Sequence, residues 1–297
     1  MSELGAIRMY EALARFQWWR SRRGMAPGSL EGLEIRKRLL PPAPGSDVPA
    51  DGMAGLDAWL QRRLGKGVSG CRLLDLGCGF GATSFRALQA GAEHVVGVTP
   101  SAYQVARARE VAAARDQSAH SRFERQAMNE ALPKVDHVVA IEALGHTREL
   151  GDVLRNVAAS LRAGRDSRFV WLEDLLVADG EELDGDPDVA GLATAWHSPP
   201  MRSRAAADAA LRAAGFEIVE DVDLTSQVPR RDVAAIERSL RRTRRGRLVT
   251  PVPFVRRVLG AFVGGFLLER LYARGCACYR LMVARPALGP ATKEISE

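Results

Sequence analysis

The sequence is poor in cysteine and has no long apolar run. Only four cysteines are present, and none forms a C-x-x-C pair: Cys71, Cys78, Cys276 and Cys278. This excludes a disulfide framework and the usual spacing of a zinc site. The longest mostly apolar stretch, Val258–Leu268, is shorter than the about 20 residues that span a bilayer. Met1–Tyr10 lacks the apolar core of a signal peptide. We therefore expect a reduced, cytoplasmic protein.

Charge, in contrast, is abundant and unevenly placed. The 297 residues carry a formal net charge of +6. One short segment holds eight arginines: Arg230, Arg231, Arg238, Arg241, Arg242, Arg244, Arg245 and Arg247. Such a cluster suits a phosphate group, a nucleic acid or an anionic lipid surface, and it equally suits a solvated helix face. Composition leaves these alternatives open.

Short apolar runs alternate with helical stretches from residue 71 onward. We predict strands at Arg72–Leu76, His94–Val98, Arg122–Arg125, His137–Ile141, Ser167–Leu172, Phe216–Val222 and Cys276–Val283. We predict helices at Glu3–Arg22, Met53–Leu64, Ala82–Ala90, Ala102–Ala114, Glu149–Leu161, Arg202–Ala213 and Phe254–Arg274. This alternation predicts an α/β fold with a Rossmann-like, doubly wound, mostly parallel sheet of seven strands.

Helical additions flank the predicted sheet. We expect residues 1–66 to form an N-terminal helical lid, with a Pro/Gly-rich linker at Pro41–Gly52. Residues 67–228 and 275–297 would form the core. Residues 229–274 interrupt the alternation and would form a helical cap inserted before the last strand.

The first predicted strand runs into a glycine-rich turn, in which Asp75 is followed by Gly77, Cys78, Gly79 and Gly81. Glycines permit a tight turn and a close approach of backbone to ligand. The spacing G-x-G-x-G differs from that of dinucleotide enzymes, and a carboxylate would repel a pyrophosphate but suit a cationic amino acid. The turn resembles motif I of class I S-adenosylmethionine-dependent methyltransferases. That resemblance implies their fold, S-adenosylmethionine as cofactor, and contacts from these five residues to its methionine part.

The second predicted strand ends without the usual acidic residue. Thr99 stands there and Gln104 follows five positions later, which resembles sterol and tocopherol methyltransferases and cyclopropane fatty acid synthases. The resemblance implies that both side chains serve the cofactor; alternatively, Thr99 caps a helix and Gln104 lies at the surface. Met128 and Asn129 align with the superfamily's adenine contact, Met128 over the ring and Asn129 at its edge. Met128 would equally suit the core.

The fourth predicted strand leads into Glu142-Ala-Leu-Gly-His146. This segment resembles that of sterol and terpenoid-diphosphate C-methyltransferases, which implies that Glu142 is a base. Cyclopropane synthases carry an acid where Gly145 stands here, which argues against cyclopropanation. With an alkene acceptor, a carboxylate would stabilise the carbocation and accept its proton. With a hydroxyl or amine acceptor, His146 would be the natural base. Both residues have structural roles as alternatives.

Several further side chains are candidates for substrate contact. The aromatic ones are Tyr10, Trp18 and Trp19 in the N-terminal helix and Trp196 in a loop before a later helix. Their rings would stabilise a cation, with ordinary packing as the alternative. Glu173 and Asp174 end the fifth strand and either touch substrate or a metal, or cap the following loop. No metal site is assigned.

These features predict a methyltransferase that modifies a small, lipophilic molecule in specialised metabolism. The favoured reaction is C-methylation of an unsaturated, isoprenoid-like acceptor, and a diphosphate on that acceptor would give the cluster Arg230–Arg247 a partner. The alternatives are O- or N-methylation of a secondary metabolite and, more remotely, a non-catalytic cofactor binder or an RNA binder. No stacking platform for nucleic acid is evident, so no such partner is expected. The predicted helix Phe254–Arg274 has three alternative roles: to cover the substrate, to dock on a membrane surface or to complete the core. We favour a cover over the substrate.

Overall fold

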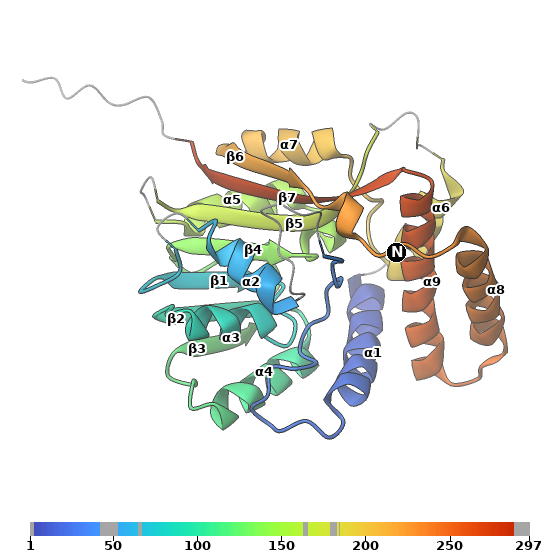
Figure 1. Cartoon of the computed structure of the whole chain (residues 1–297), viewed down its shortest axis with the longest axis horizontal. Coiled ribbons are helices and arrows are strands. Elements are labelled where there is room, and N and C mark those ends of the chain that lie inside the picture. The colour runs from blue at the N-terminus through green and yellow to red at the C-terminus, as the bar shows by residue number, and fades with distance from the viewer. Residues whose placement is uncertain are drawn as a thin grey trace, which may run out of the picture.

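A seven-stranded sheet runs through the molecule (Figure 1). The computed structural model describes residues 3–41, 53–64, 67–162, 166–178, 183 and 185–287. The strands are β1 (Arg72–Leu76), β2 (His94–Thr99), β3 (Ser121–Arg125), β4 (His137–Ile141), β5 (Arg168–Leu176), β6 (Phe216–Asp223) and β7 (Ala277–Pro286). Their order is β3-β2-β1-β4-β5-β7-β6, and only β7 runs antiparallel to its neighbours. The predicted Rossmann-like α/β fold is confirmed.

Helices cover both faces of the sheet. One face carries α2 (Met53–Gln61), α3 (Ala82–Gln89) and α4 (Ala102–Ala114), and the other carries α5 (Leu150–Ser160) and α7 (Arg204–Ala213) (Figure 1). Successive strand residues alternate between the faces, as the pleat requires. Leu73 packs in the core that contains α2, whereas Leu74 packs in the core that contains α5.

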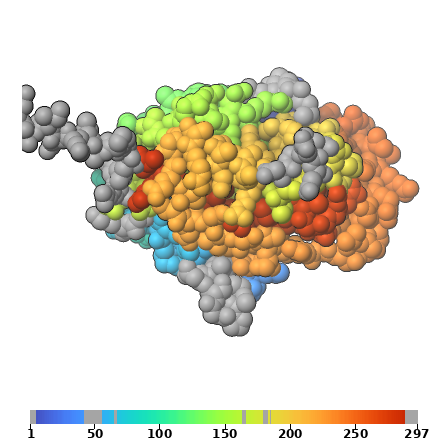
Figure 2. All heavy atoms as spheres, turned by 90° about the horizontal axis from the view of Figure 1, so that it is seen from above, coloured from blue at the N-terminus to red at the C-terminus, as the bar shows by residue number. Residues whose placement is uncertain are grey.

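The remaining helices lie where the parallel strands end. They are α1 (Glu3–Arg22), α6 (Pro187–Trp196), α8 (Val233–Val249) and α9 (Pro253–Ala273). α9 contacts α1, α6 and α8, and α8 lies on its outer side, so that these two helices form one end of the molecule (Figures 1 and 2). None of the described helices combines the length and the apolar character that a bilayer crossing requires.

The structure refines the predicted lid and cap. α1 lies over the strand ends, but α2 packs on the sheet face through Trp59 and Leu60. Most of the predicted linker, residues 42–52, lies outside the described residues, as do residues 288–297 of the predicted core. The apolar face of α9 is buried, with Leu267 and Leu271 fully covered, so that this face completes the core and is not available to a membrane.

Candidate active site

A cavity of about 370 Å³ lies at the carboxyl ends of the parallel strands, where sheets of this kind bind ligands. The turns that follow β1, β2 and β4 line one side, and α1 and α9 contribute the other. The helical side is mainly apolar and includes Ile7, Met9, Leu13, Ala261 and Phe262. The cavity thus pairs a polar side at the strand ends with an apolar side beneath the helices.

The glycine-rich turn forms part of the polar side. Gly77 and Gly79 line the cavity with φ angles of 81° and 55°, a region that favours glycine. A Cβ on Gly77 would lie 2.4 Å from the Cβ of Ala143, so that a side chain there would collide with the opposite turn. Cys78 also lines the cavity, whereas Gly81, the N-cap of α3, lies outside the lining. The turn therefore brings backbone to the cavity surface where side chains would fill it.

Asp75 lies directly beneath this turn. Its side chain is buried, and Oδ2 accepts a hydrogen bond of 2.7 Å from the Ser84 hydroxyl. Burial raises the pKa of Asp75 to about 6. A buried carboxylate with little compensation gains stability from a cation that enters beside it. The position therefore suits a positively charged group of a ligand.

Arg36 supplies a cation to the same cavity. Its Nη2 donates a 2.6 Å hydrogen bond to Asp57, and its Nη1 donates a 3.0 Å hydrogen bond to the hydroxyl of Thr83. Both Arg36 and Thr83 line the cavity near Asp75. Sequence reasoning missed Arg36, because it follows α1 in a segment without a recognisable motif. An amino acid would thus find a cation and a carboxylate close together here.

The end of β2 contributes Thr99 and Gln104, which both line the cavity. The Thr99 hydroxyl donates a 2.6 Å hydrogen bond to Oε1 of Gln104. Ser101, and not Thr99, is the N-cap of α4. Met128 lines the cavity, but Asn129 is exposed and lies outside the lining. Three of these four predicted cofactor contacts therefore share one cavity.

Glu142 lines the cavity immediately after β4. Its backbone has a φ of 49°, which is uncommon for a residue with a side chain. Oε1 accepts hydrogen bonds from the backbone N–H of Lys37 at 2.9 Å and from the Tyr279 hydroxyl at 2.7 Å. The Lys37 ammonium lies 3.7 Å from the same oxygen. No donor among the described residues bonds to Oε2, so one oxygen is held while the other can meet a ligand.

A second, smaller cavity of about 70 Å³ adjoins Glu142 on the side of β5. Glu173 and Asp174 line it together with Lys37, whose ammonium pairs with Asp174. Burial alone would lower the pKa of Lys37, but the Asp174 and Glu142 carboxylates outweigh it and raise that pKa. Burial, reinforced by Asp174, raises the pKa of Glu173 to about 7, and its Oε2 accepts a hydrogen bond from the N–H of Gly145. Glu173 and Asp174 therefore lie behind Glu142, not in the main cavity.

His146 and Tyr10 lie together at the apolar side. The Tyr10 hydroxyl is 2.5 Å from Nδ1 of His146 and 3.0 Å from Nε2. Burial lowers the pKa of His146 to about 4, so the ring is neutral near pH 7. The Trp196 ring centroid lies 5.8 Å from that of His146, and all three residues line the cavity. Trp196 ends helix α6, which corrects its predicted place in a loop.

The structure places other candidates away from the cavity. Trp18 packs on Phe80, with ring centroids 4.9 Å apart, and Trp19 is 62% exposed. The arginines of α8 are absent from the cavity lining. Among the described residues, no group of three or more His, Cys, Asp or Glu side chains is arranged to hold a metal ion.

Sequence comparisons identify relatives of this chain. A family profile described as a methyltransferase domain matches residues 74–164. The O-methyltransferase rstn1 of Aspergillus nomiae is 30% identical over 172 residues, which cover 56% of this chain and 74% of that protein.

Solved structures share the fold at lower sequence identity. The cyclase SpnF superposes with a TM-score of 0.66 at 20% identity and covers 95% of this chain and 96% of its own. Geranyl diphosphate C-methyltransferase from Streptomyces coelicolor, in complex with Mg²⁺, geranyl-S-thiolodiphosphate and S-adenosylhomocysteine, gives 0.65 at 18% identity, with 93% and 97% covered. At such identities the likeness concerns the fold alone.

Proposed function

Because the chain belongs to the class I S-adenosylmethionine-dependent methyltransferases, we propose that it methylates a carbon atom of an unsaturated, isoprenoid-like acceptor, with Glu142 as the general base. The chain acts on a small molecule. The observation that carries the proposal is a carboxylate held by two hydrogen bonds and an ion pair at the edge of a largely apolar cavity, on a backbone conformation that side chains rarely adopt.

The polar side of the cavity fits S-adenosylmethionine. Asp75 would hold the ammonium group of its methionine part, and Arg36 would hold the carboxylate. Thr99 and Gln104 would serve the ribose, and Met128 would cover the adenine. When bound, the cofactor supplies a methyl group on a positively charged sulfur. His146, whose buried imidazole is neutral near pH 7, adds no further positive charge to the cavity that would hold this cofactor.

Glu142 would then act on the acceptor. A new bond between a methyl group and an alkene carbon leaves positive charge on the neighbouring carbon, and a proton must depart to restore a double bond. Such a proton is very acidic, so a carboxylate that Lys37 and Tyr279 hold in place is sufficient to accept it. The nearby rings of Trp196 and Phe262 would stabilise the positive charge until the proton leaves.

O-methylation is the second candidate, and the name of the relative rstn1 favours it. The pair Tyr10–His146 would then orient or deprotonate a hydroxyl group. His146 is poorly suited to this role, since a pKa of about 4 makes it a weak base for an alcohol.

The proposal does not include a diphosphate group on the acceptor. Among the described residues that line the main cavity, the cation is Arg36, which we assign to the cofactor. The arginines of the cluster Arg230–Arg247 are not part of this lining. The hydrocarbon part of the acceptor alone therefore enters the proposal.

Rates of variants with methyl-labelled cofactor test this assignment on a panel of neutral terpenoids, sterols, quinone precursors and prenyl diphosphates. We expect Glu142→Gln to lower kcat by about 10²–10⁴-fold and to exceed the effect of His146→Ala. Glu173→Gln is the matched control, a neighbouring buried carboxylate that leaves the rate within a few fold. A larger loss in His146→Ala, or label found only on oxygen or nitrogen, would overturn the proposal.

A further inference from the structure

The hairpin of α8 and α9 exposes an apolar tip. Five large hydrophobic side chains between residues 248 and 255 are exposed, which is nearly half of the eleven in the part of the chain that the structure describes: Leu248, Val249, Val252, Phe254 and Val255. Leu248 and Val249 are the most exposed of all, at 81% and 80%. The buried face of α9 lies elsewhere, so core packing does not account for this tip. A contiguous exposed apolar patch marks a surface that meets an apolar partner.

The same hairpin carries the positive charge of the chain. Residues 238–268 contain eight arginines and no acidic residue, which gives them a formal charge of +8, whereas the whole chain carries +6. The rest of the molecule is therefore slightly negative, and its excess positive charge is confined to this hairpin. On α8, four of the arginines occupy one face and line a hollow of about 260 Å³: Arg238, Arg241, Arg242 and Arg245.

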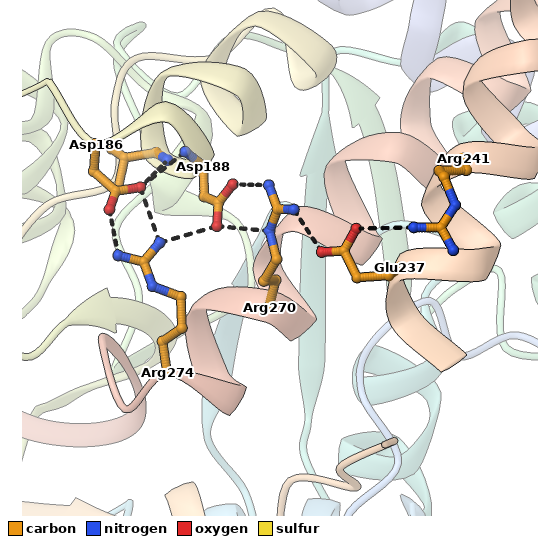
Figure 3. Close-up of polar contacts among 7 residues, drawn as sticks. Asp186, Asp188, Glu237, Arg241, Arg270 and Arg274 are labelled. Atoms are coloured by element: carbon orange, nitrogen blue, oxygen red, sulfur yellow. Dashed lines mark hydrogen bonds and ion pairs between the residues drawn. The ribbon is translucent and has the colours of Figure 1, made fainter. Parts of the chain in front are cut away.

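At the other end of the hairpin, arginines outside this face form ion pairs. Arg270 on α9 binds Asp188 in α6 and Glu237 on α8 (Figure 3). Arg274, which follows α9, binds Asp188 and also Asp186, the residue that precedes α6. This network fastens the hairpin to the body of the protein. The carboxylates of this network are already paired, and Arg241 lies 3.9 Å from Glu237. No ion pair joins Arg242 or Arg245 to any residue in the described ranges, so these charges are available to a partner.

We propose that the α8–α9 hairpin docks on an anionic membrane surface, with its apolar tip inserted among the lipids and the arginines of α8 against their headgroups. Arginines beside exposed aliphatic side chains are the composition of interfacial membrane anchors. A polynucleotide would use the arginines but would leave the exposed aliphatic tip without a partner. A single strand would also need stacking rings, of which the tip offers Phe254 alone.

The hairpin also connects this surface to the cavity. Phe254 in the tip and Phe262 in the cavity lining lie on the same helix, about 12 Å apart along its axis. A docked hairpin would bring the cavity close to the lipid interface, from which a lipophilic acceptor can enter. This use of the surface rests on the proposed function, but membrane binding itself does not depend on which atom is methylated.

Sedimentation of the full chain with phosphatidylcholine vesicles, with and without phosphatidylglycerol, tests the proposal. We expect binding to the anionic vesicles, weaker binding to the neutral ones, and a decrease with added salt. Arg242→Gln should weaken anionic binding about fivefold, and Leu248→Ser combined with Val249→Ser should weaken it at least about tenfold. The matched controls are Arg212→Gln and Val177→Ser, which change an exposed arginine and an exposed valine elsewhere and should leave binding unchanged.

Thermal stabilisation by S-adenosylhomocysteine verifies that each variant is folded and keeps its cofactor cavity. The proposal is overturned if the chain ignores anionic vesicles, or if the tip variants bind as the controls do. Tighter binding to RNA than to vesicles, or a concentration-dependent dimer that the tip variants abolish without vesicle binding, would overturn it as well. Methylation of oxygen in the assay above would refute the proposed function and leave this result standing.

Discussion

Gly77 offers the most specific test of how the turn after β1 is built. Gly77→Ala would add a Cβ that lies 2.4 Å from the Cβ of Ala143 and 3.2 Å from Cε of Met128, on a residue with a φ of 81°. Left-handed backbone costs a residue with a side chain about 1 kcal/mol. Overpacking adds about 1–3 kcal/mol. We therefore expect the free energy of unfolding to fall by about 2–4 kcal/mol.

Gly215 provides the matched control. It has a φ of 84°, but a Cβ there would meet no atom within 4 Å. Gly215→Ala should therefore lower the free energy of unfolding by about 1 kcal/mol, from backbone strain alone. Urea unfolding measures both values, and titration calorimetry with S-adenosylhomocysteine should show weaker binding for the Gly77 variant only.

A double variant separates collision from strain. Combining Gly77→Ala with Ala143→Gly removes the opposing Cβ, and the two changes should couple favourably by about 1 kcal/mol or more. Equal destabilisation by Gly77→Ala and Gly215→Ala, or additive effects in the double variant, would refute the close contact between the turns after β1 and β4.

Three further predictions concern pH. Burial raises the pKa of Asp75 to about 6, so the dissociation constant for S-adenosylhomocysteine should fall about tenfold per unit as the pH rises towards this value and then level off; calorimetry should find no such dependence in Asp75→Asn. The pKa of Glu173 is raised from 4.5 to about 7, so its contribution to stability is complete below pH 4.5 and is lost as the pH rises through 7. Unfolding experiments should show that the free energy of unfolding of the wild type increases relative to that of Glu173→Gln as the pH falls across this window. The pKa of His146 is lowered from 6.5 to about 4, so its contribution is present above 6.5 and is lost as the pH falls towards 4, and His146→Gln should flatten this part of the stability profile.

The sheet was largely predictable from sequence because its signal is local. Apolar runs of strand length alternate with helical segments, and the predicted bounds of β1 and β4 coincide with those observed. α6 was not predicted, although the Asp186-Pro187 pair is a typical helix start. α8 was seen only as a charge cluster, since its arginines obscure the apolar positions Ile236 and Leu240 that pack inward.

The cavity was predictable only in part, for a physical reason. Asp75 and Gly77 belong to a contiguous motif, so the fold of one turn places them. Arg36, Lys37 and Tyr279 come from distant segments, and only tertiary packing brings them to the site. No sequence pattern identifies Lys37 as a partner of Glu142 and Asp174, because this role depends on how the segment after α1 packs against the ends of β4 and β5.

The position of the transferred methyl group tests the central claim most directly. Wild-type enzyme would be incubated with methyl-labelled S-adenosylmethionine and each acceptor that incorporates label, and nuclear magnetic resonance of the product would identify the atom that carries the methyl group. We predict a new carbon–carbon bond, with a double bond beside it where Glu142 has removed the proton. A methyl group bound to oxygen or nitrogen in every labelled product would contradict the account.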